Sequence, residues 1–282
     1  RLFGLLPPDQ GAALHALRDE FEAGITPAAR HARACDAAQP LFEELARDDL
    51  TRLDRDMLDG LLTTGRAAPL ASDWPVLHGR ATALLSRTGA PEDPDLDRRL
   101  RFLAEADLLK TVTRGTTLHD GTRRENSAEH SWHVALHALI LAEHATRPPD
   151  IARAIRMLLI HDLVEIDAGD TPIHGAHDPA LIEAKERAAA RRLFGLLPER
   201  QGGELLRLWT EFEAAGTTDA IYAKSIDRLP PVLANLASGG GTWHDYAVTR
   251  DQLETRVGAK VARGTPAIWS YLGPTLDGWF GA

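Results

Sequence analysis

The chain has 282 residues, which allows one large domain or two small ones. Asp and Glu outnumber Lys and Arg by 41 to 32, and the formal charge of −9 argues against a nucleic-acid polymer as the main partner, because such binding needs a basic face. A small phosphorylated ligand is still allowed, since a local basic pocket can lie inside an acidic protein. The apolar runs are too short to cross a bilayer, and the single cysteine, Cys35, allows no internal disulfide. We therefore expect a cytoplasmic protein without a membrane partner.

The first part of the chain repeats the last part. Residues 1–8 read RLFGLLPP and residues 192–199 read RLFGLLPE, and this offset of 191 continues for about 46 positions, of which about 22 are identical. Further on, the register slips by about four residues, so that Trp74 aligns with Trp269. The sequence predicts a tandem duplication in which residues 1–88 are a partial, degenerate copy of 192–282. Because the segment of about 93–191 has no earlier counterpart, we expect the sequence to begin within the first copy.

A linker and then a complete domain are predicted after the first copy. Residues 89–94 read GAPEDP, which is typical of a linker, so the complete domain is expected over 93–282. Ala, Leu, Arg and Glu dominate, strand-type alternation is scarce, and the predicted fold class is all-α. We expect Ser127 to be the N-cap of the first helix of this domain, and Gly195 to end the third. In chain order, the helices are predicted over about 127–145, 149–164, 179–194, 200–214, 218–237, 248–258 and 265–279.

The strongest candidate for chemistry is the pair His161-Asp162, which follows the apolar run 157–160. We expect the pair at the end of a buried helix, where both side chains can reach one ion that lies between their faces. Glu165 and Asp170 follow in an acidic segment. Because buried carboxylates need a compensating positive charge, the pattern favours a divalent metal ion.

Two more residues can complete such a metal site. His130, in AEHSWHVA, offers a second imidazole, and Asp227, in AKSIDRLPP, lies among apolar neighbours. Two imidazoles and two carboxylates suit Mn²⁺, Fe²⁺, Co²⁺ or Zn²⁺. The prediction is one divalent metal ion whose ligands are His130, His161, Asp162 and Asp227.

Three segments carry a resemblance to a known family: RRENSAEHSWH (123–133), LLIHDLVEIDAGDTP (158–172) and AKSIDRL (223–229). They resemble the HD superfamily of metal-dependent phosphohydrolases, and most closely the subgroup that includes the bacterial 5′-deoxynucleotidases. The resemblance covers about 95–282, and through the repeat it covers 1–88 as the back half of a second copy. It implies a helical bundle, a single divalent metal, and hydrolysis of a phosphomonoester such as a nucleoside or deoxynucleoside 5′-monophosphate.

The resemblance also implies roles for individual residues. Glu165 would orient or deprotonate a water molecule, and Asp170 would assist it or contact the substrate. Cationic side chains should hold the phosphate oxygens, and the candidates are Lys110, Arg114, Arg123, Arg124 and Lys224, of which Arg114 and Arg124 are favoured. Deoxynucleotidases of the family carry a Trp after the Arg that corresponds to Arg114, whereas Gly115 follows it here.

Two other functions are open at this stage. A di-iron HD oxygenase would recruit further histidines after the HD pair, such as His174 or His177. A non-catalytic, metal-stabilised regulatory or interaction module is suggested by the first copy, which retains Asp36 but nothing that matches His130 or the HD pair. We expect residues 1–88 to be inert in catalysis, and we expect a homodimer or a contact with 93–282 to cover their apolar face.

Overall fold

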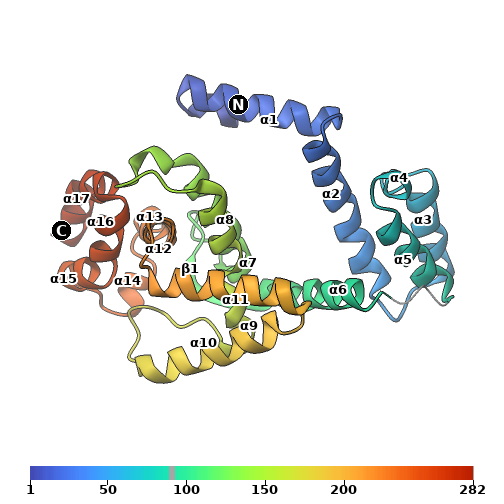
Figure 1. Ribbon diagram of the computed structural model, residues 1–282. Helices are drawn as coiled ribbons and strands as arrows, with labels where there is room; N and C mark the ends of the chain where they lie inside the picture. The colour runs from blue at the N-terminus through green and yellow to red at the C-terminus, as the bar shows by residue number, and fades with distance from the viewer. Residues whose placement is uncertain (89–92, 282) are drawn as a thin grey trace. The chain divides into compact units, whose positions relative to one another are not determined.

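The computed structural model describes residues 1–88 and 93–281 and divides into two compact units, Arg1–Asp93 and Pro94–Ala282 (Figure 1). Helices make up nearly all of the regular structure in the described residues, so the predicted all-α class is confirmed. The described part also contains one short two-stranded sheet, which the sequence did not indicate. No described helix has the length and hydropathy needed to cross a membrane. Residues 89–92 of the predicted linker lie outside the described residues.

Unit 1 is a small group of helices. They are η1 (Leu2–Leu5), α1 (Pro8–Ala23), α2 (Pro27–Leu45), α3 (Arg52–Thr63), α4 (Leu70–Asp73) and α5 (Pro75–Ser86). Helix α2 packs against α1, α4 and α5, and α3 packs against α5. Leu41, Leu58 and Leu70 are fully buried among these helices. The core of this unit is therefore built from small and aliphatic side chains.

Unit 2 holds the remaining elements. In chain order they are α6 (Pro94–Asp107), η2 (Leu108–Thr111), β1 (Thr113–Thr117), β2 (Arg124–Asn126), α7 (Ser127–Ile140), η3 (Ala142–His144), α8 (Ile151–Ile160), η4 (His161–Val164), α9 (Glu165–Ala168), α10 (Pro179–Phe194), α11 (Glu199–Ala214), α12 (Thr218–Asp227), α13 (Leu229–Ala237), α14 (Thr242–Asp245), α15 (Arg250–Leu253), the π-helix η5 (Glu254–Gly258), α16 (Ala259–Gly264) and α17 (Pro266–Phe280). The strands are antiparallel, with an irregularity between Thr113 and Thr117.

The core of unit 2 forms where α7, α8, α11 and α12 meet. Phe212 and Tyr222 are fully buried there, and the Tyr222 hydroxyl donates a hydrogen bond of 2.8 Å to the carbonyl oxygen of Ala138. Helix α8 continues into η4, and α12 ends next to both. The helices that carry the predicted metal ligands are therefore neighbours in the same core.

Two helix boundaries differ from the prediction. Asn126, not Ser127, is the N-cap of α7: its side chain accepts from the backbone N–H of Glu129, whose carboxylate accepts from the N–H of Asn126. This reciprocal capping box satisfies two free donors at the helix start. The helix predicted over 218–237 is two helices, α12 and α13, because Pro230 and Pro231 have no N–H to continue the backbone ladder.

The helices of the two units begin at equivalent positions of the repeat. Helices α1 and α11 start 191 residues apart and end 191 residues apart. Helix α5 starts at Pro75 and α17 at Pro266, again 191 residues apart. The preceding residues, Trp74 and Thr265, have almost the same backbone angles (φ −148°, ψ 67° and φ −138°, ψ 62°). The predicted slip, which aligned Trp74 with Trp269, is therefore not how these helices correspond.

A tight corner before the first helix of each copy depends on glycine. A Cβ on Gly11 would lie 2.6 Å from the carbonyl oxygen of Phe3, and one on Gly202 would lie 2.2 Å from that of Phe194. Any larger residue would collide with the backbone at either position. Both units therefore retain the same close approach between the corner and the helix.

The two copies differ in which apolar residues they bury. Leu208 is 4% exposed and shares a core cluster with Val134 and Leu158, whereas the equivalent Leu17 is 59% exposed. The buried partners of Leu208 come from α7 and α8, which have no counterpart in residues 1–88. The exposed face of unit 1 thus coincides with the part of the domain that the first copy lacks.

Candidate active site

The structure brings the four predicted metal ligands together. His130 lies on α7, His161 and Asp162 on η4, and Asp227 at the end of α12, and all four side chains are buried. Oδ1 of Asp227 lies 3.0 Å from Nε2 of His130 and 3.2 Å from Nε2 of His161. Oδ1 of Asp162 lies 3.0 Å from the same His161 nitrogen. Ligand atoms of His130, His161 and Asp162 all fall within 4.8 Å of one another.

The donor set fits a divalent cation. Nδ1 of His161 lies 2.8 Å from the carbonyl oxygen of Leu158, which can only accept, so this nitrogen carries the proton and Nε2 of a neutral ring carries a lone pair. That lone pair faces two carboxylate oxygens, so positive charge is needed among these atoms. Burial lowers the pKa of His161, but Asp162 and Asp227 outweigh it and raise the pKa above its ordinary value. A metal ion held by two imidazoles and two carboxylates supplies the same positive charge.

Glu125 supports this cluster from behind, a role that the sequence reasoning missed. Its Oε1 lies 3.4 Å from Nδ1 of His130 and 3.3 Å from Nε of Arg114, and all three atoms are buried without a well-formed hydrogen bond. A carboxylate beside the outer nitrogen of a ligand histidine orients the ring and strengthens the inner nitrogen as a donor. Glu125 is the first residue of the ENxxEH motif, so the signal was present in the sequence.

The two predicted catalytic carboxylates border the same cluster. Nη1 of Arg114 lies 2.8 Å from Asp162, 3.6 Å from Glu165 and 3.7 Å from Asp170. Burial and the charge of Asp162 raise the pKa of Glu165 to about 9, although Arg114 opposes this. Ser127 donates a hydrogen bond to Glu165, and Asp170 accepts one of 3.2 Å from the N–H of Gly115. Glu165 is therefore a group that can hold a proton near neutral pH.

The predicted substrate-binding cations are placed differently from one another. Arg114 lies in the pocket, where its guanidinium contacts the carboxylates. Lys224 also lines the pocket, with Nζ 2.9 Å from Glu213 and 4.1 Å from the ring centre of Phe212. Arg124 is exposed on β2, 3.6 Å from Asp245, and is not among the lining residues. The structure thus brings Arg114 and Lys224, but not Arg124, to the pocket.

The contacts of Lys224 recur in the first copy. The equivalent Arg33 lies 3.8 Å from Glu22 and 5.7 Å from the ring centre of Phe21, at the positions that match Glu213 and Phe212. Unit 1 has no counterpart of the histidine cluster. The placement of Lys224 therefore follows from the packing of a helix pair that both copies share.

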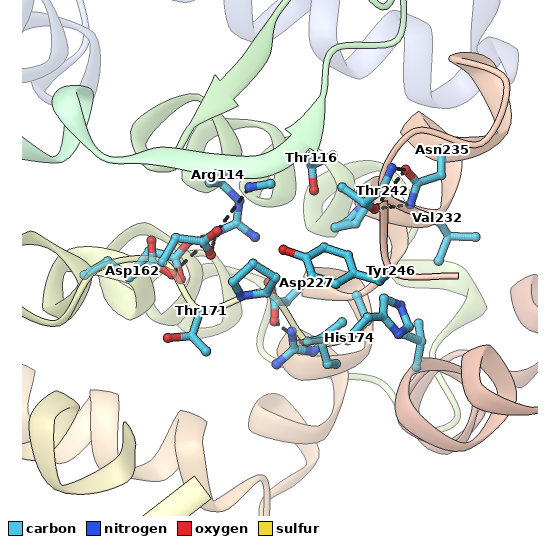
Figure 2. A pocket seen from close by; sticks show the side chains of 18 of the residues that line it. Arg114, Thr116, Asp162, Thr171, His174, Asp227, Val232, Asn235, Thr242 and Tyr246 are labelled. Atoms are coloured by element: carbon cyan, nitrogen blue, oxygen red, sulfur yellow. Dashed lines mark hydrogen bonds and ion pairs between the residues drawn. The ribbon is translucent and has the colours of Figure 1, made fainter. Parts of the chain in front are cut away.

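The pocket extends away from the charged cluster (Figure 2). Figure 2 shows Arg114 and Asp162 at one end, Asn235 and Thr242 at the other, and the ring of Tyr246 between them. Sequence reasoning had marked none of the last three, and it had also passed over the lining residues Thr116 and Arg228. Nε of Arg228 is buried 3.4 Å from Oδ2 of Asp227, and its position directly after Asp227 was the one available signal. Of the two histidines considered for a second iron, His174 lines the pocket and His177 does not.

Comparisons with known proteins agree with the geometry. A family model described as HD domain matches residues 1–75 and 106–269. The 5′-deoxynucleotidase HDDC2 of Homo sapiens is 27% identical over 135 residues, which are 48% of this chain and 65% of that protein. The Xenopus laevis protein of the same name is 31% identical over 140 residues, 49% of this chain and 67% of the relative. The matched part of the chain thus spans about 65% of the human relative's length.

A solved structure is similar over a longer stretch. It is described as a predicted metal-dependent phosphohydrolase from Magnetospirillum magnetotacticum, and it is 45% identical with a TM-score of 0.62. The match covers 66% of this chain and 96% of that one. The similarity therefore includes nearly the whole of the solved protein.

Proposed function

The chain belongs to the HD domain family, as its motifs predict, and from this premise we propose that it is a metal-dependent phosphohydrolase acting on a nucleoside or deoxynucleoside 5′-monophosphate. The names of the relatives and of the solved neighbour support the reaction class. The observation that carries the proposal is the buried cluster of His130, His161, Asp162 and Asp227, with Glu165 beside it.

The cluster is proposed to hold one divalent ion, with Mn²⁺, Co²⁺, Fe²⁺ and Zn²⁺ all suited to its donors. Such an ion, when bound, would lower the pKa of a water molecule toward neutrality and neutralise charge on the phosphate. Glu125 and the carbonyl oxygen of Leu158 hold the two imidazoles so that each presents Nε2 to the centre.

Glu165 is the proposed proton-transfer group. Water forms a new P–O bond while the ester P–O bond breaks, so one proton must leave the water and one must reach the leaving sugar oxygen. Glu165 can accept the first and donate the second, because its buried carboxyl has a raised pKa and Ser127 fixes one of its oxygens. Asp170 supports Arg114 from the opposite side.

Three cations are proposed to bind the phosphate oxygens. Arg114 and Lys224 were predicted from the sequence, and Arg228 joins them because it lines the pocket with a buried Nε that lacks a hydrogen bond. Guanidinium groups suit phosphate because they donate two parallel hydrogen bonds. Arg124 is left out of the proposed site because it lies outside the lining residues.

The proposal is tested by phosphate release from a panel of nucleotides with Mn²⁺ or Co²⁺. We expect turnover by the wild type, none by His161→Ala, and turnover by His119→Ala, an exposed histidine outside the pocket. Absence of phosphate release by the wild type from every nucleotide would contradict the proposal, as would full activity of Asp162→Ala. Two irons per chain, measured by elemental analysis, would favour the oxygenase alternative.

The role of the first copy remains a prediction. Residues 1–88 are proposed to be inert in catalysis, because Asp36 has no equivalents of the histidine ligands beside it. A homodimer, or contact with 93–282, is proposed to cover the exposed apolar residues of unit 1. A cytoplasmic location is proposed from the single cysteine.

A further inference from the structure

One end of the pocket is not used by the proposed chemistry. Beyond the charged cluster, the walls are formed by uncharged side chains that include Pro172, His174, Val232 and Tyr246 (Figure 2). A phosphate held at the Arg114 end would direct the rest of the ester toward these residues. This end of the pocket therefore faces the part of the substrate that is not phosphate.

The backbone at Tyr246 is held firmly in place. Tyr246 follows α14, and its N–H donates a hydrogen bond of 3.1 Å to the carbonyl oxygen of Thr242. The buried Asn235 side chain fixes Thr242 in turn: Oδ1 accepts from the Thr242 N–H at 2.9 Å, and Nδ2 donates to the Thr242 hydroxyl at 3.0 Å. The Asn235 amide is thus occupied by the protein, and its effect is to position the Tyr246 ring.

Two polar groups at this end have no partner of their own. In the described part of the chain, the Tyr246 hydroxyl makes no hydrogen bond, and the residue is 38% exposed, with its ring lying along the pocket (Figure 2). Nδ1 of His174 is buried and lacks a hydrogen-bond partner. Burial, and then the charge of Arg256, lower the pKa of His174, so its ring is neutral at pH 7. The end of the pocket thus offers an aromatic face and uncharged polar atoms.

We propose that Tyr246 binds the nucleobase of the substrate by stacking, with His174 as an uncharged hydrogen-bonding group at the same end of the pocket. The inference rests on the proposed function, since only a nucleotide brings a base to this place. Every base has a π face, so stacking contributes about 1–3 kcal/mol per base with little preference among bases. The expected enzyme therefore accepts several bases.

The test compares binding of two ligands to the Mn²⁺-loaded protein by calorimetry. One ligand is a deoxynucleoside 5′-monophosphate, and the other is 2-deoxyribose 5-phosphate, which lacks the base. We expect Tyr246→Ala to weaken nucleotide binding about 5- to 100-fold and to leave the sugar phosphate unchanged. Tyr246→Phe should keep wild-type affinity, because it keeps the ring. Tyr271→Ala, at the most exposed of the large apolar side chains, is the matched control.

Two outcomes would overturn the inference: equal binding of both ligands by the wild type, or an equal loss of both in Tyr246→Ala. Phosphate release is measured in parallel. A base-dependent affinity that Tyr246→Ala removes, without turnover of any nucleotide, would refute the proposed function and still support a base-binding Tyr246. Turnover with no effect of Tyr246→Ala on nucleotide affinity would do the reverse.

Discussion

Asp36 and Asp227 occupy equivalent positions of the internal repeat, 191 residues apart, but only Asp227 lies between two imidazoles. Asp227 is 4% exposed and Asp36 is exposed to solvent. Burial, which raises the pKa of Asp227, is outweighed by Arg228, His130 and His161, which hold it well below its ordinary value. The same side chain therefore gains a charged, ligand-like environment only in the copy that has the histidines.

Asp227→Asn and Asp36→Asn form a matched pair that tests the metal site. We expect Asp227→Asn to weaken metal binding by more than about 100-fold, since loss of a ligand exceeds the 10- to 100-fold loss that follows removal of an outer partner. Asp36→Asn should keep wild-type metal content and activity. Elemental analysis and phosphate release measure both. Equal metal content in the two variants would contradict the assignment of Asp227.

Glu165→Gln is expected to separate metal binding from turnover. The amide cannot accept a proton from water, so kcat should fall about 10²- to 10⁴-fold while metal content stays at the wild-type level. Glu183→Gln, on the exposed side of α10, serves as the control and should not change kcat. A variant at Glu165 that loses its metal would instead indicate that this carboxylate is a ligand.

Glu125→Gln is expected to weaken metal affinity about 10- to 100-fold, because His130 then loses the carboxylate behind Nδ1. Glu129→Gln is the informative comparison, since Glu129 lies in the same motif but caps α7. That variant should lower the melting temperature without a comparable loss of metal affinity. The measurement is competition with a chelator of known affinity, together with thermal unfolding.

Leu208→Ala and Leu17→Ala probe the same repeat position in two environments. The buried Leu208 packs with residues of α7 and α8, so its truncation should cost about 2–5 kcal/mol. The exposed Leu17 should cost at most about 0.5 kcal/mol. Urea unfolding followed by circular dichroism gives both values. A large loss in Leu17→Ala would show that its side chain is covered in solution.

His133 makes stability depend on pH between about 4 and 6.5. Burial, and then His137 and His119, lower its pKa to about 4. The unfolded chain binds a proton below pH 6.5 while the folded chain does not, so stability falls as the pH drops through this range. We expect His133→Gln to remove about 1–2 kcal/mol of this dependence, less than the limit of about 1.4 kcal/mol per pH unit. His144→Gln, on an exposed side chain, should leave the dependence unchanged.

The metal ligands could be predicted from the sequence because each lies in a short, unusual pattern. An HD pair after an apolar run, and an Asp between Ile226 and Arg228, are local signals of buried charge. Tyr246 could not be found in this way, because an isolated tyrosine outside a periodic segment has no pattern that distinguishes it. Its place in the pocket depends on the clamp between Asn235 and Thr242, which forms only in the folded chain.

Errors in the prediction came from features that depend on the three-dimensional backbone. Arg124 lies next to the ligand helix in sequence, yet its strand turns the side chain away from the pocket. The alignment of Trp74 with Trp269 followed residue identity, whereas the helix starts at Pro75 and Pro266 set the spatial correspondence. Identity between two tryptophans is a weaker constraint than the geometry of a helix start.

The corner at Gly11 and Gly202 has a consequence for how the chain folds. The same close approach forms in unit 1, which lacks α7 and α8, and in unit 2, which has them. Its geometry is therefore encoded within about a dozen consecutive residues, and contacts of such short sequence separation carry little loop-closure entropy. The corner and its helix are a nucleation element that is available before the rest of the domain assembles, and each copy of the repeat carries one.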